Sequence, residues 1–180
     1  MYTDSQRRAH IYNLQRFLRR IQLAQGAPQP LAPDGIFGPE TAAAVRDFQR
    51  RGHLPVTGTA DFATWSAIYA AFAALSGGDA LPPAAAFFPT AATATLSPGD
   101  KGPSIFVLQL MLGTSIPHFG SLPPVPLTGE YDADTEAAIR RAQGWFQLPA
   151  TGVTDRATWT ALTLLHNSLF DRTPLAWQLE

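Results

Sequence analysis

Histidines and carboxylates are the residues of this chain best suited to catalysis or metal binding, and their spacing argues against both. The four histidines, His10, His53, His118 and His166, stand far apart, and none has a second ligand at the spacing of a metal site. The chain also lacks a Gly-x-Ser-x-Gly elbow, and without cysteine it has no thiolate nucleophile. We therefore expect no catalytic residue, no metal site and no cofactor.

A pair of carboxylates could still hydrolyse a glycosidic bond, and the sequence leaves this alternative open. However, the acidic residues stand mostly at turns and before expected helices. Asp61, Asp132 and Asp155 occupy positions where a carboxylate accepts a hydrogen bond from a free backbone N–H at a helix start. We favour capping over catalysis for these three residues, and we predict that the chain is not an enzyme.

A turn followed by a helix start is the main candidate for a binding site. Residues 34–41 have the sequence Asp-Gly-Ile-Phe-Gly-Pro-Glu-Thr, in which Asp34 marks a turn and Pro39 fits the first helical position. Asp34, Phe37 and Thr41 could line a shallow groove, where free N–H groups of the helix would bind a peptide carboxylate. Alternatively, Asp34 makes the turn, Phe37 is core and Thr41 belongs to the first helical turn. Both interpretations stay open.

Two tryptophans and two glutamines also allow a functional and a structural interpretation. Trp65 and Trp159 could stack on a sugar ring, but a core this small needs large buried side chains, so we favour core packing. Gln49 and Gln143 could hydrogen-bond the amide of a ligand. We favour the interpretation that they satisfy backbone groups of a loop inside the fold.

The chain contains an internal repeat. When the sequence is shifted by 94 residues, residues 11–68 align with residues 105–162 without a gap, and about a third of the positions are identical. Thr41 then aligns with Thr135, and Arg46 aligns with Arg140. A repeat of this length indicates two copies of one small fold, each near the lower size limit for an independent core.

The repeat extends the candidate site to the second copy. Thr135 and Arg140 take the positions of Thr41 and Arg46 on the second expected helix of their copy. Either arginine could pair with a carboxylate of a ligand, although a solvated helix face is the commoner explanation. The candidate ligand-binding residues are therefore Asp34, Phe37, Thr41, Arg46, Thr135 and Arg140.

Hydrophobic spacing predicts an all-α fold of two tandem three-helix bundles, with short turns or hairpins between the helices. Ile11, Leu14, Leu18 and Ile21 recur at three and four residues, as on one face of a helix. The second helix should carry Ala44, Val45 and Phe48 inward, and the third should bury Trp65 and Ile68. The predicted organisation is a first module over 1–75, a packed Ala/Pro/Gly-rich linker over 76–95, a second module over 96–169 and a packed tail over 170–180.

The motifs of both copies resemble the peptidoglycan-binding domain 1 family. The first copy has Leu14-Gln15, the turn at residues 34–41, Leu54-Pro55-Val56-Thr57-Gly58 and Ala63-Thr64-Trp65; the second has the opening Gly99-Asp100-Lys101-Gly102, Leu108-Gln109, Leu148-Pro149 and Thr158-Trp159. The resemblance implies non-catalytic binding of peptidoglycan or muropeptide, through grooves beside the second helix of each module. The second copy replaces Asp34, Phe37 and Gly38 of the turn, so the first copy is the expected binder.

Composition narrows the range of partners. The net charge is −1, with 13 basic and 14 acidic residues, which gives no electrostatic basis for binding nucleic acid. No apolar run is long enough for membrane insertion, and no secretory signal is visible after Met1. We expect an envelope or extracytoplasmic location, with delivery from the cytoplasm by another route as an alternative.

A structural or adaptor protein of a spore or envelope layer is the alternative function. Here the same modules would contact a protein partner or form a homo-oligomer. Adjacent aromatic residues at Phe87-Phe88 and Trp145-Phe146, together with Trp177 in the tail, motivate this hypothesis.

Overall fold

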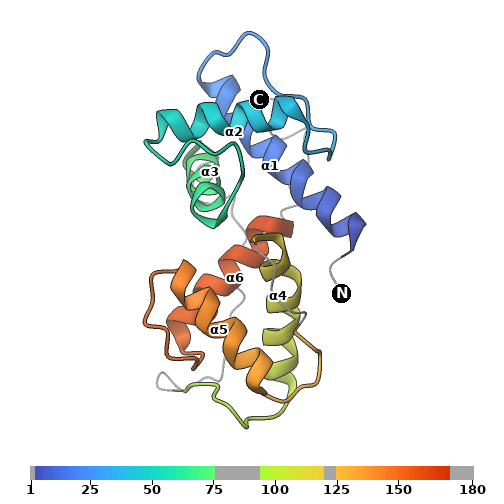
Figure 1. Cartoon of the computed structure of the whole chain (residues 1–180), viewed down its shortest axis with the longest axis vertical. Helices are drawn as coiled ribbons and strands as arrows, with labels where there is room; N and C mark the ends of the chain where they lie inside the picture. The colour runs from blue at the N-terminus through green and yellow to red at the C-terminus, as the bar shows by residue number, and fades with distance from the viewer. Residues whose placement is uncertain (1–2, 76–93, 120–124, 171–180) are drawn as a thin grey trace. The chain divides into compact units, whose positions relative to one another are not determined.

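The structure is a computed structural model, and it describes residues 3–75, 94–119 and 125–170. These residues form six helices and no strand: α1 (Asp4–Ala24), α2 (Pro39–Arg51), α3 (Phe62–Leu75), α4 (Pro103–Phe119), α5 (Ala133–Trp145) and α6 (Arg156–Phe170) (Figure 1). The predicted all-α fold is confirmed. In the same residues, no helix combines the length and apolar character that crossing a membrane requires.

The chain divides into two compact units that we call the N-terminal and C-terminal modules. The first contains α1, α2 and α3, and the second contains α4, α5 and nearly all of α6. The expected packing of the linker and the tail rests on residues 76–93 and 171–180, which lie outside the described residues.

The core of the N-terminal module forms where α1 packs against α2 and α3. Leu14, Phe17 and Leu18 of α1 are buried, as their spacing on one helix face predicts. Phe17 meets the ring of Trp65 edge-on at a centroid distance of 5.9 Å. Because Trp65 is only 1% exposed, its predicted place in the core is confirmed.

The inward face of α2 is narrower than the sequence predicts. Ala44 and Val45 are buried as expected, but Phe48 is only half-buried.

In the C-terminal module α4 packs against α5. Its core cluster brings residues of all three helices together: Ile105, Leu108, Met111, Leu112, Ile116, Ala138, Ile139, Trp159 and Leu162. The core position of Trp159 is therefore confirmed as well.

The three predicted caps are confirmed. One carboxylate oxygen of Asp61 accepts a hydrogen bond from the backbone N–H of Thr64 at 2.8 Å. Asp132 and Asp155 accept the equivalent bonds at 2.8 Å at the starts of α5 and α6. Helix α2 begins at Pro39, as predicted, but its N-cap residue is Gly38, which supplies no side-chain cap.

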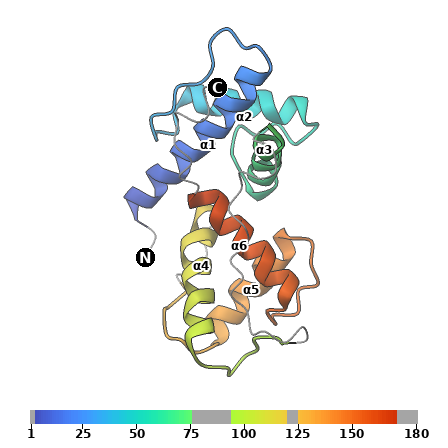
Figure 2. The ribbon, with the colours of Figure 1, turned by 180° about the vertical axis from the view of Figure 1, so that it is seen from behind.

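A buried glutamine of α1 holds the turn that leads into α2. The Nε2 of Gln15 donates to Asp34 Oδ1 at 2.8 Å, to the Ile36 carbonyl at 3.0 Å and to Thr41 Oγ1 at 2.9 Å. Its Oε1 accepts from the backbone N–H groups of Asp34 and Gly35 at 2.9 and 2.8 Å. Figure 2 shows the loop over residues 25–38 leading from the end of α1 back to the start of α2. Gln15 thus fixes where α2 begins. We call this arrangement a glutamine clamp.

The same clamp occurs four times in the described residues. Gln49, Gln109 and Gln143 each bind a turn glycine, a carbonyl and a threonine hydroxyl in the first turn of the next helix, in the way that Gln15 does. The clamped glycines are Gly35, Gly58, Gly129 and Gly152, with φ between 71° and 78°. A side chain would be strained in this left-handed region, which explains the glycine. The structural interpretation of Gln49 and Gln143 is confirmed.

Replacing Gln15 with leucine should strongly destabilise the N-terminal module. The change leaves the buried Gly35 N–H and Thr41 hydroxyl, and the partly buried Asp34 N–H and Ile36 C=O, without their partner, and a buried group without a partner costs about 1–3 kcal/mol. We expect the free energy of unfolding of this module to fall by about 3 kcal/mol or more, measured by urea denaturation of the full chain.

The matched control is Gln22→Leu, two turns further along α1. The Oε1 of Gln22 accepts one bond, from the Leu31 backbone N–H at 2.7 Å. Its loss should cost only about 1 kcal/mol. Equal effects of the two substitutions would show that the clamp does not carry the stability assigned to it.

Candidate functional site

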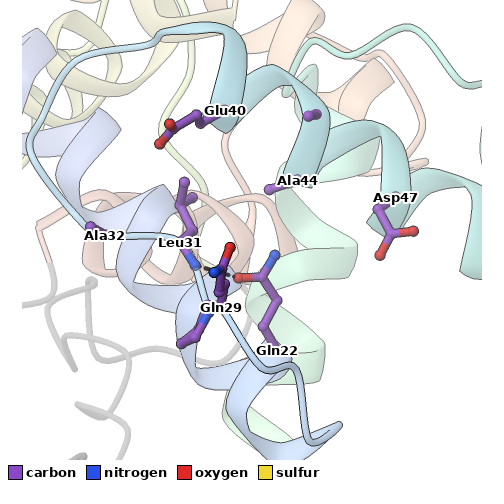
Figure 3. Close-up of a pocket in the computed structure, with 9 residues that line it drawn as sticks. Gln22, Gln29, Leu31, Ala32, Glu40, Ala44 and Asp47 are labelled. Atoms are coloured by element: carbon purple, nitrogen blue, oxygen red, sulfur yellow. Dashed lines mark hydrogen bonds between the residues drawn. The ribbon is translucent and has the colours of Figure 1, made fainter.

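One face of α2 borders an open groove of about 480 Å³ in the N-terminal module. The opposite side of the groove is formed by the end of α1 and by the loop that follows it (Figure 3). The lining residues are Gln22, Gln29, Pro30, Leu31, Ala32, Glu40, Ala43, Ala44 and Asp47. The groove therefore lies wholly within one module.

Two side chains of α1 pin the loop that forms this wall. Gln22 accepts a hydrogen bond from the Leu31 backbone N–H at 2.7 Å, drawn as a dashed line in Figure 3. The Arg19 guanidinium donates to the carbonyls of Leu31 at 3.1 Å and Pro30 at 3.4 Å. Because Leu31 is also buried, with 8% of its surface exposed, the wall is anchored rather than loose.

The groove carries two carboxylates in different settings. Asp47 is engaged by Arg51 at 2.9 Å and by Arg50 at 3.3 Å, so its charge is compensated. Glu40 is exposed, and within the described residues its carboxylate has neither a hydrogen bond nor an ion pair. Glu40 therefore supplies the uncompensated negative charge of the groove.

Asp34 and Thr41, two of the predicted ligand-binding residues, are brought together by Gln15. Hydrogen bonds from the Gln15 side chain and then from the Ile36 backbone N–H hold the pKa of Asp34 below its ordinary value. Thr41 is 2% exposed, and its hydroxyl accepts from Gln15. Both side chains hold the turn in place, as the structural interpretation of the turn describes.

Phe37 and Arg46 lie at the surface. Phe37 is 39% exposed and does not belong to the core, because the turn directs it outward beside Ile36, which is 60% exposed. Arg46 is exposed and lies over Gly58, where an added Cβ would collide with its guanidinium. None of the six predicted residues lines the groove.

Thr135 and Arg140, the predicted pair of the C-terminal module, are engaged internally. Thr135 is fully buried, and its hydroxyl accepts from Gln109 at 3.0 Å and donates to Asp132 at 2.6 Å. Arg140 donates to Glu136 at 2.6 Å and to the Ala150 carbonyl at 2.7 Å. The position of Glu136 is taken by Ala42 in the N-terminal module, so Arg46 lacks the corresponding carboxylate partner.

The family comparison matches more than half of the chain. The model of the family described as "Putative peptidoglycan binding domain" covers residues 7–68 and 116–162. The chain belongs to this family. The second matched segment corresponds to residues 22–68 of the first copy and ends at its equivalent residue, which agrees with the 94-residue repeat. The comparisons with curated proteins and with solved structures give no match.

The two peptidoglycan-binding modules differ at the positions that form the groove. Gln22 corresponds to Ile116 and Asp47 to Arg141, so an amide becomes apolar and a carboxylate becomes basic. The counterparts of Gln29 and Pro30, at 123 and 124, lie outside the described residues. Glu40 keeps a carboxylate counterpart in Asp134, so the described difference between the two modules at these positions is the loss of one amide and the replacement of one carboxylate by an arginine.

Tyr131 is the counterpart of Phe37 in the repeat. Its side chain is buried in the C-terminal module, whereas that of Phe37 is exposed in the N-terminal module. Tyr131 is 1% exposed, and its hydroxyl donates to the Gly152 carbonyl at 2.7 Å and lies 3.1 Å from Thr154 Oγ1. Burial raises the pKa of Tyr131 to about 12. The turn of the second copy is therefore tied to the next turn by a side chain that the first copy lacks.

The sequence predicts a groove beside the second helix, but it does not indicate the residues that line the groove or the role of Gln15 and Gln109. The groove joins residues from three segments, and their common exposure depends on the path of the loop. The clamp left a detectable signal, because each clamped glycine precedes a threonine by six residues. This spacing recurs at Gly35/Thr41, Gly58/Thr64, Gly129/Thr135 and Gly152/Thr158.

Substituting Tyr131 with phenylalanine should change how stability depends on pH. Near pH 8 the variant should be less stable by about 1 kcal/mol, because a buried hydrogen bond is lost. The folded protein keeps the Tyr131 proton up to about pH 12, whereas the unfolded chain loses it near pH 10. This stabilisation is present below pH 10 and disappears as the pH rises toward 12.

The stability difference between wild type and Tyr131→Phe should therefore shrink between about pH 8 and pH 11. Urea denaturation at both pH values measures it, and the remaining tyrosines cancel because both proteins carry them. A difference that stays constant with pH would contradict the buried, protonated state of Tyr131.

Proposed function

We propose that the chain binds bacterial peptidoglycan without cutting it, through the groove of its N-terminal module. Family membership supports peptidoglycan as the ligand class. The groove beside α2 is the observation that carries the proposal. It combines an apolar floor at Leu31 and Ala44 with a few polar groups, which is the usual composition of a specific ligand site.

The chemistry of the groove supports binding rather than catalysis. A glycosidase needs two carboxylates working as acid and as base or nucleophile. Here Asp47 is held by two arginines of its own helix. Moreover, the described residues contain no group of three or more His, Asp or Glu that could hold a metal ion.

The six residues predicted from the sequence take two roles in this proposal. Phe37 is exposed in the turn before α2 and Arg46 is exposed on α2, and both remain candidates for ligand contact. Asp34, Thr41 and Thr135 position the second helix of their module through the clamps. Arg140 is engaged by Glu136 and takes a positioning role.

A scaffolding role is the second candidate, and the C-terminal module favours it. Phe106 and Leu110 lie one turn apart on α4 and are 48% and 49% exposed, and Leu127 is 55% exposed. Such residues suit contact with a protein of the envelope or of a spore layer.

Under either function, the bacterial envelope is the expected location. Sedimentation equilibrium tests for a homo-oligomer, and a strictly monomeric protein that binds sacculi would disfavour this candidate.

Filling the groove should strongly weaken binding to cell walls. Ala43 is exposed on the groove face of α2, so Ala43→Phe places a large side chain in the groove. We expect the wild type to sediment with purified sacculi, and the apparent affinity of the variant to fall about tenfold or more, a loss of about 1.4 kcal/mol.

The matched control is Ala137→Phe at the equivalent exposed position of α5, which has the same cost in helix propensity. It should retain wild-type binding. If the wild type stays in the supernatant, the proposed function is wrong. If Ala43→Phe binds as well as the wild type, the groove is not the site.

A further inference from the structure

The side chains that line the groove favour the peptide part of peptidoglycan over its glycan strand as the occupant. A sugar ring is usually held against an aromatic face, and the lining residues include no aromatic side chain. Trp65 and Trp159, the residues best suited to stacking, are buried in the two cores. The groove instead offers methyl groups, side-chain amides and carboxylates, which are complementary to a peptide.

The apolar and amide groups are arranged to receive a short peptide with small side chains. Ala44 presents its methyl group from α2, and Leu31 lies across from it on the loop (Figure 3). Ala43 lines the same groove. Since Gln22 uses its Oε1 for the Leu31 N–H, its Nε2 hydrogens are left to donate to a peptide carbonyl. Gln29 adds a second amide at the same wall.

The charge of the groove selects among peptides. Glu40 has no partner in the described structure, while Asp47 is compensated by Arg50 and Arg51. A carboxylate flanking an apolar floor favours an ammonium group on the ligand and disfavours a second carboxylate. In the C-terminal module Asp134 keeps the carboxylate of Glu40, but Arg141 replaces Asp47 and Ile116 replaces Gln22, so a basic side chain and an apolar one stand beside that carboxylate.

We propose that the groove binds the stem peptide of peptidoglycan and requires a free side-chain amino group on it, which pairs with Glu40. This inference rests on the proposed function. Cross-linking converts the acceptor amino group of a stem into an amide, which removes its positive charge. The module would therefore prefer stems whose amino group has not been used in a cross-link.

The test compares three soluble probes by calorimetric or NMR titration of the full chain. They are N-acetyl-L-Ala-γ-D-Glu-L-Lys-D-Ala, the same peptide acetylated on the lysine Nε, and an N-acetylglucosamine oligomer. We expect the amine-bearing peptide to bind about tenfold or more tightly than the acetylated one, with the preference weakening at high salt. The sugar oligomer should bind more weakly than the amine-bearing peptide.

Two variants assign the preference to its residue. Glu40→Gln should bind both peptides equally, and its unfolding temperature should fall only by the small amount that the loss of a first-turn carboxylate costs a helix, a cost that Asp134→Asn shares. The matched control Asp134→Asn, at the equivalent position of α5, should keep the preference. A wild type that binds both peptides equally, prefers the sugar oligomer or binds no peptide overturns the inference.

A sedimentation assay with sacculi distinguishes failure of the amine requirement from failure of peptidoglycan binding itself. If the wild type sediments with sacculi but does so equally after acetylation of their free amines, peptidoglycan binding stands and the amine requirement is wrong. If it does not sediment with untreated sacculi, the proposed function itself fails.

Discussion

The hydrogen-bonding capacity of a buried glutamine amide is the constraint on which both modules depend. Each clamp turns one helix side chain into the anchor of a distant turn, because the amide can donate and accept at the same time. Gln15 and Gln109 fix where the second helices begin, and Gln49 and Gln143 fix where the third helices begin. A small helical fold can thus carry well-defined turns without strands or disulfides, and a buried network of this kind requires all of its members.

Because the clamps hold the turns from inside, the outer face of each turn is free to vary. The C-terminal module closes its outer face with its own side chains: Asp132 caps α5, Tyr131 is buried, and Glu136 engages Arg140. The N-terminal module has Gly38, Phe37 and Ala42 at these three positions, and Phe37 is exposed. The same internal network therefore supports one module whose turn is covered by its own side chains and one whose turn leaves Phe37 exposed.

Much of the fold follows from local rules in the sequence. Periodicity predicts the apolar face of α1, Pro39 predicts the start of α2, and Asp61, Asp132 and Asp155 predict the caps. These features depend on residues close together in the chain. Phe37 and Tyr131 show the limit, because two aromatic residues at equivalent positions have opposite exposure. Their environments depend on contacts with residues about twenty positions away, such as the bond from Tyr131 to Gly152.

The candidate site is harder to predict for the same reason. Its walls come from α1, the following loop and α2, and the loop reaches its place only because Gln22 and Arg19 bind it at residues 30 and 31. The sequence directs attention to the correct helix, since α2 borders the groove. The turn motif that looks most like a ligand site contains Asp34 and Thr41. The side chains of both residues accept hydrogen bonds from Gln15 in the clamp.

The central claim is that the N-terminal module presents the ligand site and the C-terminal module does not. Chemical-shift mapping of the 15N-labelled full chain with soluble muropeptide tests it most directly. The account predicts shifts at the backbone of Leu31, Glu40 and Ala43 and at the side-chain amide of Gln22, with residues 133–141 unchanged. Shifts confined to residues 133–141, or spread equally over both modules, would contradict it.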